Sequence, residues 1–343
     1  MAKKTSAALR KTYAFFFIAI TIFIIGFSGC APTYPEAKLA NAVVKVCREE
    51  YGAEIEAKLA GKTLAIYIPI PSLFEGLTSK DTDASEKTKK IIDNVIFVVS
   101  RVVVSTDANL NFYVIIMQDP NNPLLEFLVI KNVMDTKRYM LSDISRNEYG
   151  KRVVRDFKVT PQFQKAQVIK ELLGNGQVTD ENMKILQEKI LTMQAESIDD
   201  IGYWEKKFYV KDITVEEFIE KQIQGRVQDN FRDDAYLKNN FKLDNIKVKY
   251  IGADSFHLSV AVNKKSFPEN SAEEKNITKI EPNHAILLEV AATIKAYDFN
   301  KFEKIILENL ETGEIITVAK VDLEKLRKGK ISFQEIFKKG LKE

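Results

Sequence analysis

Two pairs of short segments alternate apolar and polar residues with the period of two that is typical of a β-strand. The first pair, residues 54–60 and 64–70, lies on either side of Gly61, and a second pair alternates in the same way around Gly252. A glycine between two alternating runs favours a tight turn. Each pair is therefore predicted to form a β-hairpin.

Two further hairpins are predicted where apolar runs flank turn residues. "FYVIIMQ" and "LLEFLVI" lie on either side of residues 119–123, which contain two prolines and two asparagines. "FEKIILEN" and "EIITVAK" flank the shorter Glu311-Thr312-Gly313. Proline, asparagine and glycine are the residues that turns require, so both segments are interpreted as hairpins.

The segments between and around the hairpins are predicted to be helices. Residues 85–105 are rich in Val and Ile, but the corresponding "HAILLEVAATIKAY" has the Ala and Leu spacing of a helix, and we assign both as helices. Opening helices are expected at 36–51 and 214–235. A hydroxyl residue followed three positions later by Glu is a capping box, which marks a helix start. It occurs at Ser145, Thr214 and Ser332.

These elements recur in the same order, which indicates an internal repeat. Ser145 and Glu148 match residues 187 positions later, and Asp107 matches Asp298 at an offset of 191. The predicted fold class is α+β. It comprises two tandem copies of a helix-hairpin-helix-hairpin-helix unit, each an antiparallel sheet with helices on one face, joined by a helical bridge. The alternative is chance similarity of short apolar runs.

The repeat sets the expected domain boundaries. Residues 36–158 form repeat domain 1, 159–205 the helical bridge, and 206–343 repeat domain 2. Two bridge helices without a repeat partner are expected from a Thr-Pro start and a Gly-Asn-Gly break. Trp204 is expected to pack between the bridge and the second copy.

The first 29 residues have the organisation of a signal peptide, followed by a short tether at 30–35. Residues 1–12 contain four basic side chains and no acidic one, and an apolar run follows at residues 13–27. Fifteen residues make about 22 Å of helix, shorter than the ~30 Å hydrocarbon core. A basic start, an apolar centre and a small-residue end favour a signal peptide over a membrane span.

The end of this segment refines the interpretation. Phe27-Ser28-Gly29-Cys30 resembles the lipobox of bacterial lipoproteins, although that family more often has Leu where Phe27 stands. The resemblance implies a diacylglycerol on the Cys30 thiol, cleavage before Cys30, and acylation of the new amino end. It also implies an envelope location facing the periplasm or exterior, with the outer membrane favoured because Ala31 is not Asp. The alternative is an ordinary secretory signal with an incidental cysteine.

Removing the signal changes the charge of the protein. The whole chain carries 51 basic and 48 acidic side chains, and cleavage leaves 47 against 48. A near-neutral body gives no argument for a nucleic-acid partner.

Candidate chemistry is sparse. With Cys30 acylated, Cys47 has no disulfide partner, and its helical register places it on an apolar face. His257 and His284 are not part of a metal-ligand motif, so no metal or cofactor is expected. No nucleophile, metalloprotease or phosphate-loop motif occurs, and no catalytic residue is assigned.

The sequence therefore predicts a membrane-anchored envelope lipoprotein that acts as a non-catalytic binding module for a protein or another envelope component. Two alternatives remain open. One is an envelope hydrolase with dispersed acid and base residues between the domains. The other is a carrier of a lipid or apolar ligand, which would require an enclosed apolar pocket.

Overall fold

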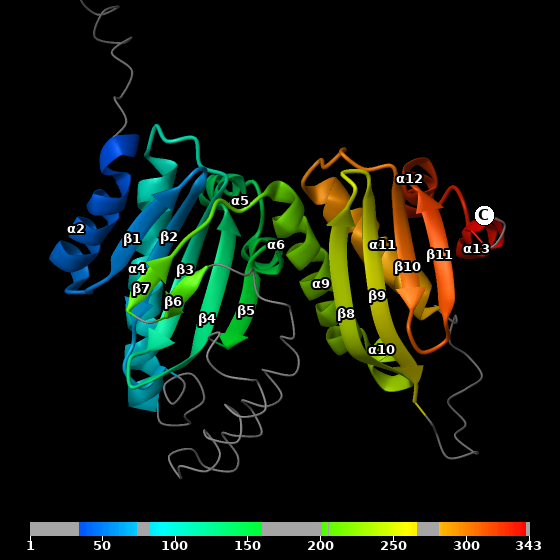
Figure 1. Cartoon of the computed structure of the whole chain (residues 1–343), viewed down its shortest axis with the longest axis horizontal. Helices are drawn as coiled ribbons and strands as arrows, with labels where there is room; N and C mark the ends of the chain where they lie inside the picture. Colours follow the sequence, from blue (N-terminus) through cyan, green and yellow to red (C-terminus); the bar gives the residue numbers. More distant parts are fainter. Residues whose placement is uncertain (1–33, 74–81, 160–200, 205, 266–280, 341–343) are drawn as a thin grey trace, which may run out of the picture.

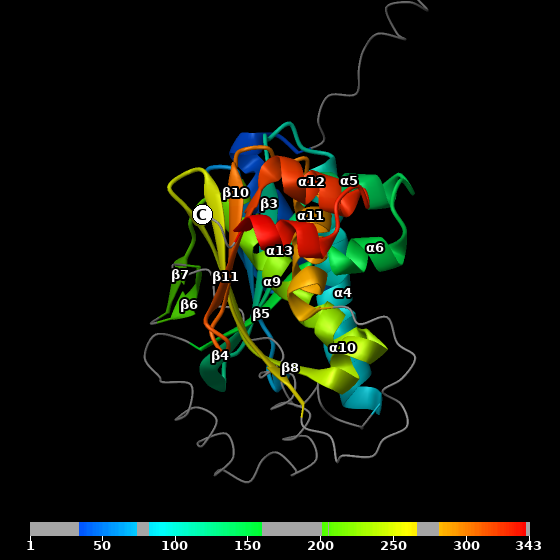
Figure 2. The ribbon, with the colours of Figure 1, turned by 90° about the vertical axis from the view of Figure 1, so that its right-hand side faces the viewer.

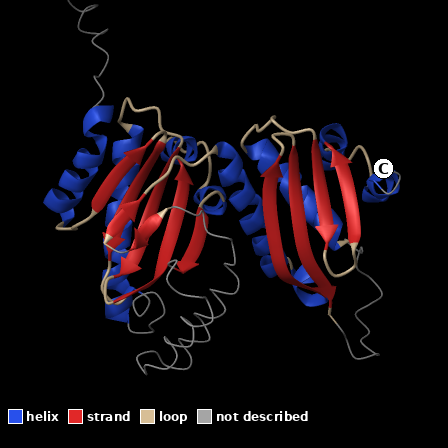
Figure 3. Cartoon of the chain, in the orientation of Figure 1, coloured by secondary structure: helices blue, strands red, loops and turns tan. Residues whose placement is uncertain are grey.

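The computed structural model has an α+β architecture with two larger sheets and one small hairpin (Figure 3). It describes residues 34–73, 82–159, 201–204, 206–265 and 281–340. Cys30 and residues 160–200 of the predicted bridge lie outside these ranges.

The first unit, residues 34–159, contains a five-stranded sheet with strand order β1-β2-β3-β4-β5. Its elements are η1 (Glu36–Lys38), α2 (Leu39–Tyr51), β1 (Glu56–Ala60), β2 (Thr63–Pro69), α4 (Thr82–Val104), β3 (Phe112–Asp119), β4 (Asn122–Asn132), α5 (Val133–Met140), α6 (Arg146–Lys151) and β5 (Val154–Val159). The predicted hairpins and helices of this half are confirmed. β5 and α5 were not predicted, and the repetition of one unit along the chain stays a prediction.

The second unit, residues 215–340, contains a four-stranded sheet with strand order β11-β10-β9-β8. Its elements are α9 (Val215–Asp233), α10 (Ala235–Asn240), β8 (Phe241–Ile251), β9 (Ser255–Lys264), α11 (Pro282–Ala296), β10 (Lys304–Asn309), β11 (Glu314–Ala319), α12 (Lys320–Arg327) and α13 (Phe333–Gly340). The capping boxes at Thr214 and Ser332 both form.

The expectation of fully antiparallel sheets is wrong for the central pair of each sheet. β2 pairs with β3 in parallel, and β9 pairs with β10 in parallel, whereas the remaining neighbours are antiparallel. The physical reason is the helix between the two hairpins. α4 and α11 each carry the chain back along the sheet, so that the next strand starts at the same end as the one before it.

α4 is a helix despite its Val and Ile content because burial outweighs the small propensity penalty. Its buried positions follow helical spacing, whereas Phe97 is exposed. These buried positions are Val95, Val98, Val99, Val102 and Val103. With α2 they form one core with the inner face of the first sheet.

The first sheet is covered on its other face as well. A short hairpin, β6 (Gly202–Trp204) and β7 (Lys207–Tyr209), lies over it (Figure 1). Every residue of β3 is buried as a result. Trp204 stacks on Tyr209, at the start of the predicted second copy, with ring centroids 4.0 Å apart, and Lys158 Nζ of the first unit lies 4.7 Å from the Trp204 ring centroid. Residues 202–204 form a strand where the helical bridge was expected.

The second sheet has helices on its inner face only, in the part of the chain that the structure describes (Figures 1 and 2). Burial along β8 alternates accordingly. Its outer face carries two rows of residues paired across the strands: Lys249, His257, Ile306 and Thr317, then Lys247, Ser259, Glu308 and Ile315. We call these eight residues the open face.

Candidate functional site

The amino-terminal end of the described chain is fixed to the first unit. Thr106 Oγ1 donates a hydrogen bond of 2.6 Å to the Tyr34 carbonyl, and Glu36 N donates one of 2.7 Å to Asp107 Oδ1. Asp107 belongs to the polar turn predicted from sequence. Cys30 itself lies outside the described residues, but only three residues separate it from this attachment.

The two units meet along α9, whose side chains belong to both. Phe218 is buried in the core on the outer face of the first sheet and packs on Phe112 with ring centroids 4.7 Å apart. Ile219 and Ile223 are buried in the core of the second unit. One helix that contributes to two cores holds the units in a fixed relation, because moving either unit would expose apolar surface.

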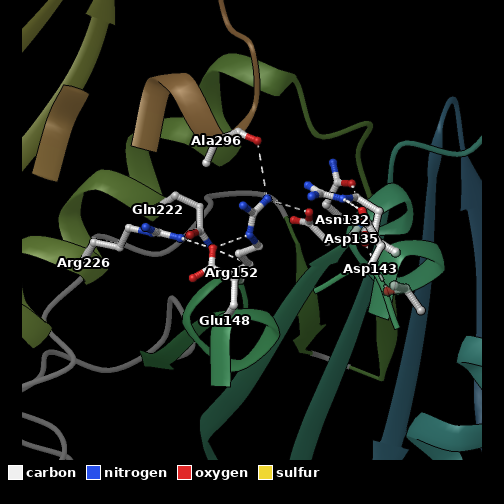
Figure 4. A network of polar contacts seen from close by, with 10 residues as sticks. Asn132, Asp135, Asp143, Glu148, Arg152, Gln222, Arg226 and Ala296 are labelled. Carbon is white, nitrogen blue, oxygen red and sulfur yellow. Dashed lines mark hydrogen bonds and ion pairs between the residues drawn. The ribbon is translucent and has the colours of Figure 1, made fainter. Parts of the chain in front are cut away.

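Arg152 forms the centre of a polar network across this seam (Figure 4). Its Nη1 donates a hydrogen bond of 2.9 Å to Asp135 Oδ1, and its Nε donates one of 2.7 Å to Glu148 Oε1. All three residues belong to the first unit. Across the seam, Gln222 Nε2 donates a hydrogen bond of 2.7 Å to the Arg152 carbonyl. Arg226 of the second unit lies 3.5 Å from Glu148 Oε1.

The ionisable groups of this network are neutralised by one another. The side chains of Arg152 and Asp135 are 8% and 5% exposed. Burial raises the pKa of Asp135, and the charge of Arg152 opposes that rise. Burial also favours neutral Glu148, but hydrogen bonds from Arg152 and the charge of Arg226 lower its pKa overall. The charge-assisted contact between Glu148 and Arg226 therefore joins the first unit to the second.

A second tie joins the segment before α9 to the β1–β2 turn. Asp212 Oδ1 accepts hydrogen bonds from Lys62 N at 2.9 Å and from Thr63 Oγ1 at 3.0 Å. Gly61, at φ 54°, allows this approach, because an added Cβ would lie 2.3 Å from Asp212 Oδ2. The predicted turn glycine therefore also serves a long-range contact.

A buried polar cluster fastens β6 to the first sheet. We call Tyr67, Gln118, Glu126 and Lys158 the β6 cluster. Gln118 Nε2 donates a hydrogen bond of 2.9 Å to the Tyr203 carbonyl, and Lys158 Nζ donates one of 2.9 Å to the Ile201 carbonyl. Tyr67 OH donates a hydrogen bond of 3.1 Å to Gln118 Oε1.

Glu126 is the acid of this cluster and is fully buried. Its Oε1 accepts hydrogen bonds from Tyr203 N at 2.5 Å and from Gln118 Nε2 at 3.3 Å. Its Oε2 has no hydrogen-bond partner among the residues that the structure describes. Burial raises the pKa of Glu126 to about 7, against opposing effects from the Tyr203 amide and from Lys158.

Glu126→Gln is expected to remove one component of the pH dependence of stability. A folded-state pKa above the unfolded one means that Glu126 stabilises the protein fully below about pH 4.5, and that this stabilisation is lost as pH rises through about 7. We expect the variant to be more stable than the wild type at pH 8 by up to ~3 kcal/mol, and nearly equal to it at pH 4.5. Urea unfolding at both pH values measures the difference. Parallel pH curves for the two proteins would contradict the assignment.

A third cluster lies beneath α5 and α6. Tyr113 OH lies 3.1 Å from Thr136 Oγ1 and 3.3 Å from Tyr149 OH. Lys131 Nζ lies over the rings of both tyrosines, and burial lowers its pKa to about 8. A lysine with such a pKa is chemically capable of attacking a carbonyl. That chemistry needs access for a substrate, and no residue of this cluster lines either of the hollows described next.

Two hollows of the described surface lie elsewhere. A shallow, open depression of about 470 Å³ is lined by Glu36, Ala37, Ala40, Asn41 and Leu59 of the first unit. A hollow of about 80 Å³ lies between the carboxyl end of α11 and α12 in the second unit. Pockets for small organic ligands are commonly about 300–1,000 Å³, so the second hollow is too small for one, and the first has the volume but is open to solvent rather than enclosed.

The sequence candidates for chemistry are separated in space. Cys47 is buried, as predicted, and burial raises the pKa of its thiol to about 11. His257 lies on the open face, whereas His284 of α11 stacks on Phe333 with ring centroids 5.4 Å apart. Among the described residues, no group of three or more metal-ligating side chains is present.

Comparisons with known proteins found no matching family model, no matching curated protein and no matching solved structure. No helix in the described ranges has the length and apolarity needed to cross a bilayer.

Sequence reasoning missed both the seam and the β6 cluster. Glu126 is a single charge in an apolar run, whereas Arg152 and Lys158 lie in the charged stretch "GKRVVRDFK", and none of the three matches a motif. The available signal was their position, because a charge at an inward position of a strand such as "LLEFLVI" must be paired or neutral.

Proposed function

We propose that this protein is a lipid-anchored protein of the bacterial cell envelope that holds a partner protein on its second sheet without catalysing a reaction. The observation that carries the proposal is the contrast between the two sheets. The outer face of the first is apolar and covered by β6 and β7, whereas the open face of the second is exposed or half-buried.

The chemistry of the open face suits a protein partner. It combines Lys247, Lys249, His257 and Glu308 with the apolar Ile306 and Ile315. Side chains of both polarities at fixed spacing on a rigid sheet are typical of a polar protein–protein surface. The seam supports the same role, because a rigid connection between the units keeps this face in a constant position relative to the anchor.

The membrane anchor rests on the lipobox resemblance. Acylation of Cys30 would attach the body by two or three chains, which is enough for stable anchoring. The cell envelope is the location that follows, with the outer membrane favoured in a cell with two membranes.

We further infer that the two units arose by duplication. Thr63 of β2 pairs with Phe112 of β3, and Ser255 of β9 pairs with Lys304 of β10, with the same separation of 49 residues in each case. Backbone hydrogen bonds also recur: Asn111 N donates to Lys62 O, as Glu303 N donates to Asp254 O. Similar register and similar turn contacts support a common origin.

Site-specific cross-linking in intact cells tests partner binding. A photo-crosslinking amino acid at His257 or Ser259 is expected to give one adduct of constant mass. The same amino acid at Lys89, an exposed position on α4, serves as the control and should give none. Absence of adducts at all three positions, or equal adducts at all three, would argue against a partner on the open face.

The alternative functions receive less support from the described residues. An interdomain hydrolase needs convergent carboxylates in an open cleft, whereas Asp135 and Glu148 are held by Arg152 in a packed seam. A carrier needs an enclosed apolar pocket, whereas the depression of about 470 Å³ beside Glu36 and Leu59 is open, and the hollow beside α11 is about 80 Å³ and is lined in part by charged residues.

A further inference from the structure

One end of the molecule exposes apolar side chains from both units. We call it the tether end and define it by Tyr34, the β1–β2 turn, the β8–β9 turn, α5 with the following Leu141, α12, and the start of α9, which Ile213 N joins to Thr63 Oγ1. In the first unit, Asn111 N donates to Lys62 O and Val133 N donates to Asn111 O, which brings the β1–β2 turn next to the start of α5. The corresponding hydrogen bonds in the second unit bring the β8–β9 turn next to the start of α12. Figures 1 and 2 show these parts at the same end, uppermost in both views.

Large apolar residues are concentrated there. Of the eleven exposed large hydrophobic side chains among the described residues, seven belong to this end. They are Met134, Tyr139, Met140, Leu141, Val215, Ile251 and Val321. Leu141 is 81% exposed. Exposed apolar side chains gathered on one side of a protein mark a surface that another body covers.

The length of the tether indicates what that body is. Tyr34 is bound to the first unit, and it lies four residues after Cys30. Four residues span at most ~14 Å when fully extended. An acylated Cys30 therefore holds the tether end within about that distance of the lipid headgroups.

We propose that the tether end rests on the bilayer, with Leu141, Met134 and Val321 among the lipid headgroups. This inference rests on the proposed lipid anchor. Anchoring supplies an effective concentration on the order of millimolar, so contacts too weak to recruit a free protein hold a tethered one. The surface then orients both units, and the open face stands beside the membrane, clear of the lipid.

Charge is not the main source of this contact. Some side chains at the tether end are paired, as in Arg138–Asp143 at 2.5 Å and Lys325–Asp322 at 3.1 Å. α5 and α12 together carry five basic and three acidic residues, and this small positive excess adds a weak attraction to anionic lipid. The docking is therefore expected on neutral bilayers as well as on anionic ones.

Fluorescence quenching by lipids tests the orientation. Leu141→Cys and its matched control Leu310→Cys, which lies in the β10–β11 turn at the opposite end, are each labelled with a polarity-sensitive dye in the full acylated protein. Leu310 is also exposed, at 52%, so neither change disturbs a core. Cys47 is buried with a raised thiol pKa and does not compete for the label. The proteins are reconstituted into vesicles of phosphatidylcholine alone or of phosphatidylethanolamine with phosphatidylglycerol, each containing a headgroup-level spin-labelled lipid.

We expect quenching at position 141 to exceed that at 310 at least threefold in both lipid mixtures. Equal quenching at the two positions, or none at 141, in protein that floats with the vesicles would overturn the docking and leave the anchor intact. If a protein partner rather than lipid covered these apolar residues, the dye at position 141 would not be quenched although the protein floats with the vesicles. Protein that fails to float with the vesicles would contradict the anchor, and the docking with it.

Discussion

Cys30→Ala is expected to abolish incorporation of labelled fatty acid. The thiol is the atom to which the resemblance assigns the lipid, and alanine offers no nucleophile in its place. Signal cleavage at the lipobox should fail as well, so that the unprocessed precursor accumulates. Metabolic labelling with radioactive palmitate, followed by immunoprecipitation and electrophoresis, measures both effects.

Cys47→Ala is the matched control, because it removes the other cysteine of the chain. Cys47 is buried in the core of the first unit, where it is not accessible to an acylating enzyme. The Cys47→Ala variant should therefore be labelled like the wild type. Equal labelling of wild type and Cys30→Ala would show that the anchor assignment is wrong. Loss of label in Cys47→Ala alone would have the same meaning.

Arg152→Ala is expected to lower the free energy of unfolding by about 3–5 kcal/mol, because it leaves the buried Asp135 without its cation. The change also removes the hydrogen bond to Glu148 and the contact with the Tyr297 ring at 5.5 Å. Chemical denaturation of the wild type and the variant gives the difference. Limited proteolysis reports in addition whether the two units separate.

Two comparisons distinguish the buried charge from a general loss of packing. Asp135→Asn in the Arg152→Ala background should recover part of the lost stability, since no uncompensated charge then remains buried. Arg138→Ala breaks the exposed pair with Asp143 and should cost about 0–1 kcal/mol. Equal costs for Arg152→Ala and Arg138→Ala would contradict a structural role for the seam network.

Much of the secondary structure could be predicted because its signals are local. The hairpin around Gly61 and the helix begun at Thr214 each depend on residues within a few positions of one another. α4 needed the comparison with α11, because its Val and Ile content alone also fits a buried strand. β5 and β6 were missed because both are short and their residues do not alternate cleanly.

Ser145 shows where local reasoning ends. Its Oγ accepts a hydrogen bond from Glu148 N and caps α6, as the capping box predicts. The Glu148 carboxylate instead accepts from Arg152 and lies beside Arg226 of the second unit. At Ser332 the corresponding Glu335 returns to its own cap. The same motif therefore serves the seam in one unit and only the helix start in the other.

The sequence by itself determined the turns, the helix starts, the burial of Cys47 and the prediction of a lipid on Cys30, because each depends on side chains that are neighbours along the chain. Only the tertiary structure decided the parallel central strands, the pairing of Arg152, the burial of Glu126 and the difference between the covered and open sheet faces. These features depend on contacts such as Arg152 with Gln222, 70 residues apart, and Lys62 with Asp212, 150 residues apart. Which distant residues meet is set by how whole helices and sheets pack their apolar faces, and no local spacing carries that information.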